Sequence, residues 1–227
     1  MDRNCAPPWT RMPAAQAAAV LVLLLAASGA AALEAQPGEQ KAIDACDKRL
    51  CTMLQKKDPS GEDLKCALTK TFTRSTLKEG DTTQVKWGFG DARCSVQINI
   101  TRAAIVTAVT AKSYKFWVPL TTANCVVEQD GQLKTVTAKL EPKIEFKDGR
   151  AEKVWINLRE VEGPAAIKAT LTLGAQLNDS VGLFHRSMLK SINGYIYKLC
   201  PKYHPLTTAA TSVPAKPSPP KHKAAKP

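Results

Sequence analysis

The stretch from residue 124 to residue 158 reads NCVVEQDGQLKTVTAKLEPKIEFKDGRAEKVWINL, and it decides the fold. It contains two Asp-Gly pairs, Asp130-Gly131 and Asp148-Gly149, and each pair lies between runs of apolar and β-branched residues. Asp-Gly is favoured in two-residue hairpin turns because both central residues adopt a positive φ there. The stretch therefore predicts two hairpins, and connections this short pair strands in the antiparallel sense.

Further strand candidates extend this meander in both directions. Their threonine, valine, isoleucine and aromatic residues are bounded by turn-forming residues, which is typical of strands. The predicted strands cover residues 83–89, 93–100, 115–118, 124–128, 133–140, 143–147 and 152–158. In the last of them, Val154, Ile156 and Leu158 alternate with charged neighbours, which indicates a strand with one solvated face.

Helices are predicted on both sides of the strands. Residues 39–57 and 61–75 carry apolar side chains at three- and four-residue steps, and Ser60 could cap the second segment. Together they predict an N-terminal helical hairpin, while residues 180–199 predict a C-terminal amphipathic helix. Two further stretches, residues 101–112 and 167–177, fit either a helix or a strand. The order of elements predicts an α+β domain with an antiparallel sheet.

The first 32 residues have the composition of a cleaved export signal. Arg3 and Arg11 precede a short apolar core at residues 20–27, and small residues follow as far as Ala32. We predict cleavage near Ala32, with Ala35 as the alternative, and a secreted or periplasmic protein. An uncleaved membrane anchor is the rival interpretation, but a membrane span needs about 20 apolar residues.

The rest of the chain divides into a single domain over residues 33–200 and a tail over residues 201–227. The tail contains five lysines and no acidic residue. It has too few large apolar residues to offset the entropy of ordering the chain, so we predict a disordered basic arm. The charge near its end comes from Lys216, Lys221, Lys223 and Lys226.

Six of the seven cysteines lie beyond the predicted cleavage site, because Cys5 is removed with the signal. An even number of cysteines in an exported chain predicts disulfides. Two of them, Cys46 and Cys51, would lie about 140° apart around a helix and should not bond to each other. The preferred pairs are Cys51–Cys66, Cys94–Cys125 and Cys46–Cys200. The spacing does not suit a zinc site, and we expect no metal and no cofactor.

The formal net charge of +12 favours anionic partners. The partners expected are an anionic glycan, an anionic lipid surface or another exported protein, without specific recognition of nucleic acid. No catalytic motif is present, and His185 is the one histidine within the predicted domain. We therefore expect a non-enzymatic, exported binding or structural module. The alternatives are a secreted inhibitor or partner-binding protein and, as a third hypothesis, an enzyme of unrecognised type.

Trp155, with Lys153 and Arg159, is the candidate binding surface. If Val154, Ile156 and Leu158 face the core, Trp155 points to the opposite side of its strand. An exposed indole among basic side chains can hold a glycan or a protein partner. The alternative is that Trp155 packs under a helix.

Overall fold

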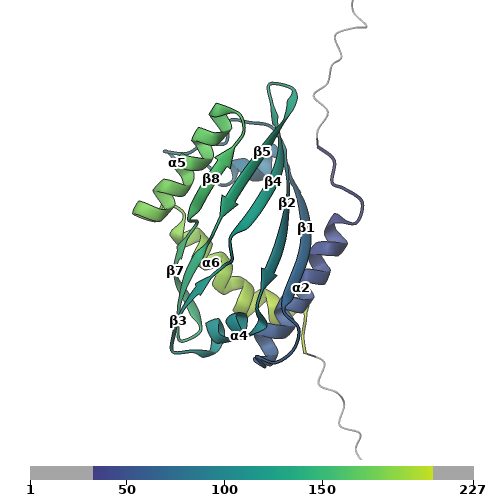
Figure 1. The fold of residues 1–227 in the computed structure, drawn as a ribbon, viewed down its shortest axis with the longest axis vertical. Coiled ribbons are helices and arrows are strands. Elements are labelled where there is room, and N and C mark those ends of the chain that lie inside the picture. The colour runs from purple at the N-terminus through teal and green to yellow at the C-terminus, as the bar shows by residue number, and fades with distance from the viewer. Residues whose placement is uncertain (1–32, 207–227) are drawn as a thin grey trace, which may run out of the picture.

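The computed structural model describes residues 33–206, so the predicted signal peptide and residues 207–227 lie outside the described residues. Helices pack on antiparallel sheets, and the predicted α+β class is confirmed (Figure 1). Within the described residues, no helix combines the length and the apolar character that crossing a membrane requires. The helices are α2 (Glu39–Lys56), α3 (Arg74–Lys78), α4 (Arg102–Thr110), α5 (Ala165–Val181), α6 (His185–Gly194), the π-helix η1 (Tyr195–Leu199) and α7 (Cys200–Tyr203). The strands are β1 (Leu64–Phe72), β2 (Ala92–Ile100), β3 (Ser113–Trp117), β4 (Thr121–Gln129), β5 (Gln132–Leu140), β6 (Lys143–Lys147), β7 (Arg150–Trp155) and β8 (Leu158–Glu162).

The strands form two sheets that continue into each other across a bend. The five-stranded sheet has the order β1-β2-β4-β5-β8, and the three-stranded sheet has the order β3-β6-β7. Short connections join β3 to β4, β5 to β6 and β7 to β8, so three neighbouring strands bend together. Backbone hydrogen bonds cross this bend from Val118 N to Pro142 O and from Glu141 N to Asn157 O. The strands thus make one meander that is folded across its middle.

Both Asp-Gly hairpin turns are confirmed. Asp130 and Gly131 have φ values of 52° and 71° and join β4 to β5, while Asp148 and Gly149 have 48° and 75° and join β6 to β7. A Cβ atom at Gly149 would lie 2.7 Å from the carbonyl oxygen of Val109, so this turn also packs tightly against the end of α4. The turns set the registers of both hairpins.

One face of the five-stranded sheet carries the core, and the helices divide that face between them. A first cluster of buried residues joins α2, α4 and β1 to the inner side of the three-stranded sheet. A second cluster lies among β4, β5, β8 and the start of α5. In Figure 1, α2 flanks the β1 edge and α5 lies at the β8 side.

Side chains from the helices pair with the backbone at the sheet edges. Glu39 accepts hydrogen bonds from Thr71 N at 2.6 Å and from Thr71 Oγ1 at 2.9 Å on β1. At β7, the side-chain amide of Asn193 accepts a hydrogen bond from Ala151 N through Oδ1 and donates one to Ala151 O through Nδ2, both at 2.9 Å. Edge strands with unpaired backbone groups recruit other chains, and these contacts occupy them.

The predicted second helix is wrong, because residues 64–72 form strand β1, so residues 39–75 do not make a helical hairpin. Leu64, Leu68 and Phe72 recur every four residues, a spacing that fits one face of a helix and also every second inward position of a strand. The predicted strand at residues 83–89 is also wrong, since this segment is irregular. The two ambiguous stretches are helices α4 and α5.

The predicted C-terminal helix is interrupted at Gly182, whose φ of 71° ends α5 before α6 begins. Similarly, the predicted strand at residues 152–158 divides at Asn157, whose φ is 45°. Both breaks occur at residue types that adopt the left-handed conformation more readily than others.

The three disulfides are Cys46–Cys66, Cys51–Cys200 and Cys94–Cys125. Cys94 and Cys125 lie directly opposite each other on β2 and β4, so that prediction is confirmed. The other two predicted pairs, Cys51–Cys66 and Cys46–Cys200, are wrong, because Cys46 and Cys51 bond to each other's predicted partner. The cause is strand β1, which packs along α2 and carries Cys66 to Cys46, leaving Cys51 to join the C-terminal helix.

Candidate functional site

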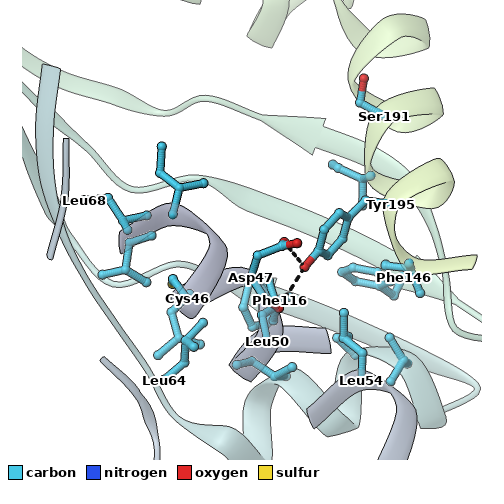
Figure 2. A pocket seen from close by; sticks show the side chains of 18 residues that line it. Cys46, Asp47, Leu50, Leu54, Leu64, Leu68, Phe116, Phe146, Ser191 and Tyr195 are labelled. Atoms are coloured by element: carbon cyan, nitrogen blue, oxygen red, sulfur yellow. Dashed lines mark hydrogen bonds between the residues drawn. The ribbon is translucent and has the colours of Figure 1, made fainter. Parts of the chain in front are cut away.

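A cavity of about 490 Å³ lies in the first core cluster, between α2, α4, η1 and the inner faces of the sheets (Figure 2). Eighteen residues line it, and all are apolar or disulfide-bonded except Asp47, Ser191 and Tyr195. Ser191 on α6 is exposed, and Ile43, Leu68 and Ile98 are among the lining residues that are partly exposed, so the cavity opens to solvent. It is an apolar space with its few polar groups on α2, α6 and η1.

The cavity walls follow from simple periodicities. Helix α2 presents Ile43, Leu50 and Leu54 at helical steps, and β2 presents Ile98 and Ile100 at a strand step. Helix α4 is capped by Thr101, whose hydroxyl accepts a hydrogen bond from Ala104 N. On this helix Ile105, Ala108 and Val109 line the cavity, and Ala108 is the smallest of the three.

The cavity opens to solvent and presents almost only apolar surface to whatever occupies it. Apolar surface that stays in contact with water forgoes the stabilisation that its burial would give. Water is a poor occupant, because it needs two to four polar partners and the lining offers few. The cavity therefore suits an apolar molecule.

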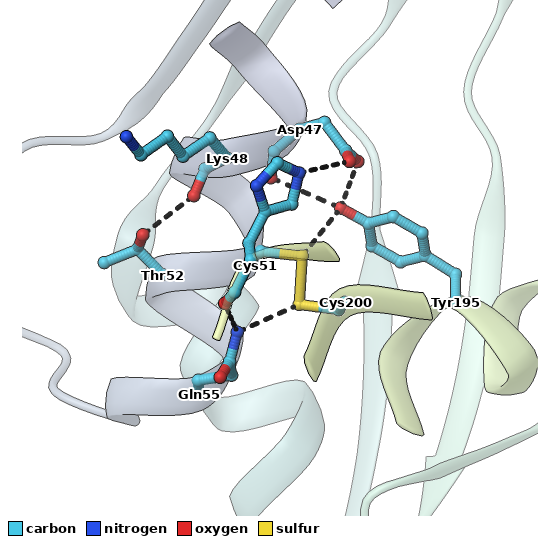
Figure 3. Close-up of a disulfide and its surroundings, with 8 residues drawn as sticks. Asp47, Lys48, Cys51, Thr52, Gln55, Tyr195 and Cys200 are labelled. Atoms are coloured by element: carbon cyan, nitrogen blue, oxygen red, sulfur yellow. Dashed lines mark hydrogen bonds and ion pairs between the residues drawn. A yellow bond between two sulfur atoms is a disulfide. The ribbon is translucent and has the colours of Figure 1, made fainter. Parts of the chain in front are cut away.

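Asp47 is the charged group of the cavity wall, and it lies between two partners (Figure 3). The Tyr195 hydroxyl donates to its Oδ1 atom, and His204 Nε2 lies 2.9 Å from its Oδ2 atom. Burial raises the pKa of the Tyr195 hydroxyl, and the hydrogen bond to Asp47 and its negative charge raise it further. Tyr195 therefore stays protonated and donates, which leaves Asp47 as an acceptor at the cavity wall.

The Cys51–Cys200 disulfide lies directly behind this pair. The Tyr195 hydroxyl is 3.4 Å from Cys51 Sγ, and Gln55 Nε2 donates to the carbonyl oxygen of His204 at 2.7 Å. The disulfide joins α2 to α7, so it fixes the two elements that carry Asp47 and His204 (Figure 3). Asp47, Cys51 and His204 have ligand atoms within 4.8 Å of one another, but the Cys51 sulfur is committed to the disulfide.

Of the predicted binding surface, the structure keeps Trp155 and Lys153 on one face of β7 and separates Arg159 from them. Trp155 is half-buried at the end of β7, and Lys153 is exposed two residues before it. Arg159 lies beyond the bend on β8, where its Nη2 atom is 2.6 Å from Glu141 Oε2. The predicted charges at Lys216, Lys221, Lys223 and Lys226 lie outside the described residues.

Trp155 has a different neighbour, which the sequence did not indicate. Lys143 Nζ lies 3.5 Å from the centroid of the Trp155 ring and 5.6 Å from that of Trp117. His185, the start of α6, packs against Trp155 edge to face with ring centroids 6.0 Å apart. Trp155 is thus partly covered by a lysine and a histidine.

Sequence reasoning missed Asp47, Tyr195 and His204. Asp47 follows Ile43 by four residues on the apolar side of α2, and a carboxylate at such a position was a usable signal. The predicted tail includes His204, yet α7 continues to Tyr203 and His204 contacts α2. Asn178, which matches a glycosylation acceptor pattern, is fully buried in α5, so the folded domain leaves no room for a glycan there.

Comparison with known proteins adds no assignment to these sites. No protein family, no curated protein and no solved structure matches this chain.

Proposed function

We propose that this chain is an exported, non-enzymatic binding protein that holds a small apolar molecule in the cavity between α2, α4 and η1. The observation that carries the proposal is the cavity, at about 490 Å³ with fifteen of its eighteen lining residues apolar or disulfide-bonded. Ligand sites typically span about 300–1,000 Å³, with mainly hydrophobic walls and a few placed polar groups. An alkyl or isoprenoid chain matches these walls.

The polar wall favours particular head groups on that chain. The Tyr195 hydroxyl donates to Asp47 Oδ1 and His204 Nε2 lies 2.9 Å from Oδ2, so the group offered to a ligand is the remaining acceptor capacity of the Asp47 carboxylate. A hydroxyl or an amine can donate to it, whereas a ligand carboxylate would meet a like charge. The expected ligand is therefore a chain with a neutral or cationic head group.

Export is part of the proposal, with cleavage near Ala32 and a secreted or periplasmic location. Three disulfides among the described residues are typical of chains that fold in an oxidising compartment. Cys46–Cys66 and Cys51–Cys200 both hold walls of the cavity, so an oxidising compartment would also maintain the binding site.

The proposal is tested by displacing an apolar fluorescent probe, such as N-phenyl-1-naphthylamine, from the purified exported protein. We expect saturable probe binding, and displacement by decanol and decylamine at concentrations at least about tenfold lower than by decanoate. The variant Ala108→Phe places a ring in the cavity and should lose probe binding. Failure of the wild type to bind the probe, or unchanged binding by Ala108→Phe, would refute the proposal.

A further inference from the structure

The outer face of the three-stranded sheet carries a row of two tryptophans and a lysine. Trp117 on β3, Lys143 on β6 and Trp155 on β7 are register partners across the three strands. Register partners project from the same side of a sheet, so the three side chains form one row. The opposite side presents Phe116, Phe146 and other buried core residues.

Basic residues surround this row. In the next row of register partners, Lys115 and Lys153 flank Glu145, and Lys147 follows on β6. The outer face therefore carries four lysines with one glutamate, and Lys115, Lys147 and Lys153 are exposed. This face has a net positive charge that suits an anionic partner.

The exposed apolar groups next to these lysines distinguish a membrane from a glycan. Trp117 is 49% exposed, and Leu120, three residues further on, is 60% exposed. A sugar needs a free ring face and polar hydrogen-bonding groups, but Lys143 lies over the Trp155 ring at 3.5 Å. An exposed tryptophan beside lysines is instead the combination found at the boundary between lipid headgroups and acyl chains.

We infer that the outer face of the three-stranded sheet docks on an anionic membrane surface. Trp117 enters the headgroup region, while Lys115, Lys147 and Lys153 lie over anionic headgroups. The side chain of Lys143 is only 19% exposed, and its Nζ atom lies between the rings of Trp117 and Trp155. This inference does not depend on what occupies the cavity, because the two sites lie on opposite sides of the three-stranded sheet.

Sedimentation with lipid vesicles tests the inference, using the full exported protein. We expect it to bind vesicles of phosphatidylcholine with phosphatidylglycerol at low salt, and to bind pure phosphatidylcholine vesicles weakly. Each lysine near such a surface contributes a factor of about five in partitioning, so Lys115→Glu/Lys153→Glu should weaken binding at least about twentyfold. High salt should remove most of this difference.

A matched variant separates this face from the general charge of the chain. Lys41→Glu/Lys48→Glu makes the same charge change on the exposed side of α2 and should weaken binding less than about threefold. All variants should retain the far-ultraviolet circular dichroism spectrum and the melting temperature of the wild type, which shows that they are folded.

Trp117→Ala should also weaken vesicle binding, and brominated lipids should quench wild-type tryptophan fluorescence more than that of Trp117→Phe. Absence of vesicle binding at low salt, or equal losses in both lysine pairs, would overturn the inference. Binding to an anionic polysaccharide but not to vesicles would also overturn it and assign the face to glycans.

Discussion

Glu39 begins α2 and is almost fully buried against the free edge of β1. Burial alone would raise the pKa of its carboxyl group. Hydrogen bonds from the backbone and side chain of Thr71 and from Gln36 N, with the charge of Lys70, outweigh burial, so the pKa is lowered. Because the charged form is the one that these groups stabilise, Glu39 links the start of α2 to the sheet most strongly when it is ionised.

Glu39→Gln should destabilise the domain at neutral pH by about 1.5–3 kcal/mol, the usual contribution of hydrogen bonds to a charged group. A lowered pKa in the folded state means that this stabilisation exists above the unfolded pKa, about 4.3, and is lost as the pH falls through the folded value. Urea unfolding of the wild type and of Glu39→Gln, from neutral pH to below about pH 4.3, measures the difference in their free energies of unfolding. A difference that persists unchanged in acid would contradict the role given to the carboxylate.

At the scale of elements, the bend between the two sheets depends on Asp179 of α5. Its two carboxylate oxygens accept hydrogen bonds from Ile156 N at 2.7 Å and from Asn157 N at 2.8 Å. Asn157 adopts a φ of 45° there, and its side chain donates to the carbonyl oxygen of Glu141. The bend is therefore held by one helix side chain and one residue in a left-handed conformation.

Asp179→Ala should lower the free energy of unfolding by about 1–3 kcal/mol, because it leaves two backbone amides without acceptors. Asn157→Gly should be tolerated, since glycine adopts this φ without strain, whereas Asn157→Val should be destabilising. Thermal and urea unfolding of the three variants check the order. Equal stability of Asn157→Gly and Asn157→Val would contradict the conformational explanation.

The sequence predicted the elements whose signal is local. The Asp-Gly turns specify both hairpins, because turn chemistry depends on neighbouring residues alone. Strand β1 could not be predicted in the same way, since the four-residue spacing of Leu64, Leu68 and Phe72 fits a helix as well as a strand. The segment forms a strand because it pairs with β2, and this pairing joins residues that are not neighbours in the sequence.

At the scale of the whole molecule, the cavity joins segments from both ends of the domain. The sequence marked its walls as core positions but could not show that they enclose a space, because volume depends on how the layers are spaced. The contact between Asp47 and His204 spans 157 residues and was missed for the same reason. The Cys51–Cys200 pair, which spans 149 residues, brings these two segments together.

Ala108→Phe and Ala92→Phe make the same change at two buried positions. Ala108 faces the cavity, so its replacement should leave the free energy of unfolding unchanged or raise it. Ala92 is packed in the second core cluster, where added volume typically costs about 1–3 kcal/mol. Urea unfolding of both variants compares them, and equal destabilisation would show that the wall at Ala108 has no spare room.

The most direct test of the central claim is calorimetric titration of the exported protein with decanol at several temperatures. Burial of an apolar chain in the cavity should give one bound decanol per chain and a negative heat-capacity change. The Ala108→Phe variant should give no saturable heat. A wild-type titration without saturation, or the same stoichiometry and heat-capacity change for Ala108→Phe, would contradict the account of the cavity as a ligand site.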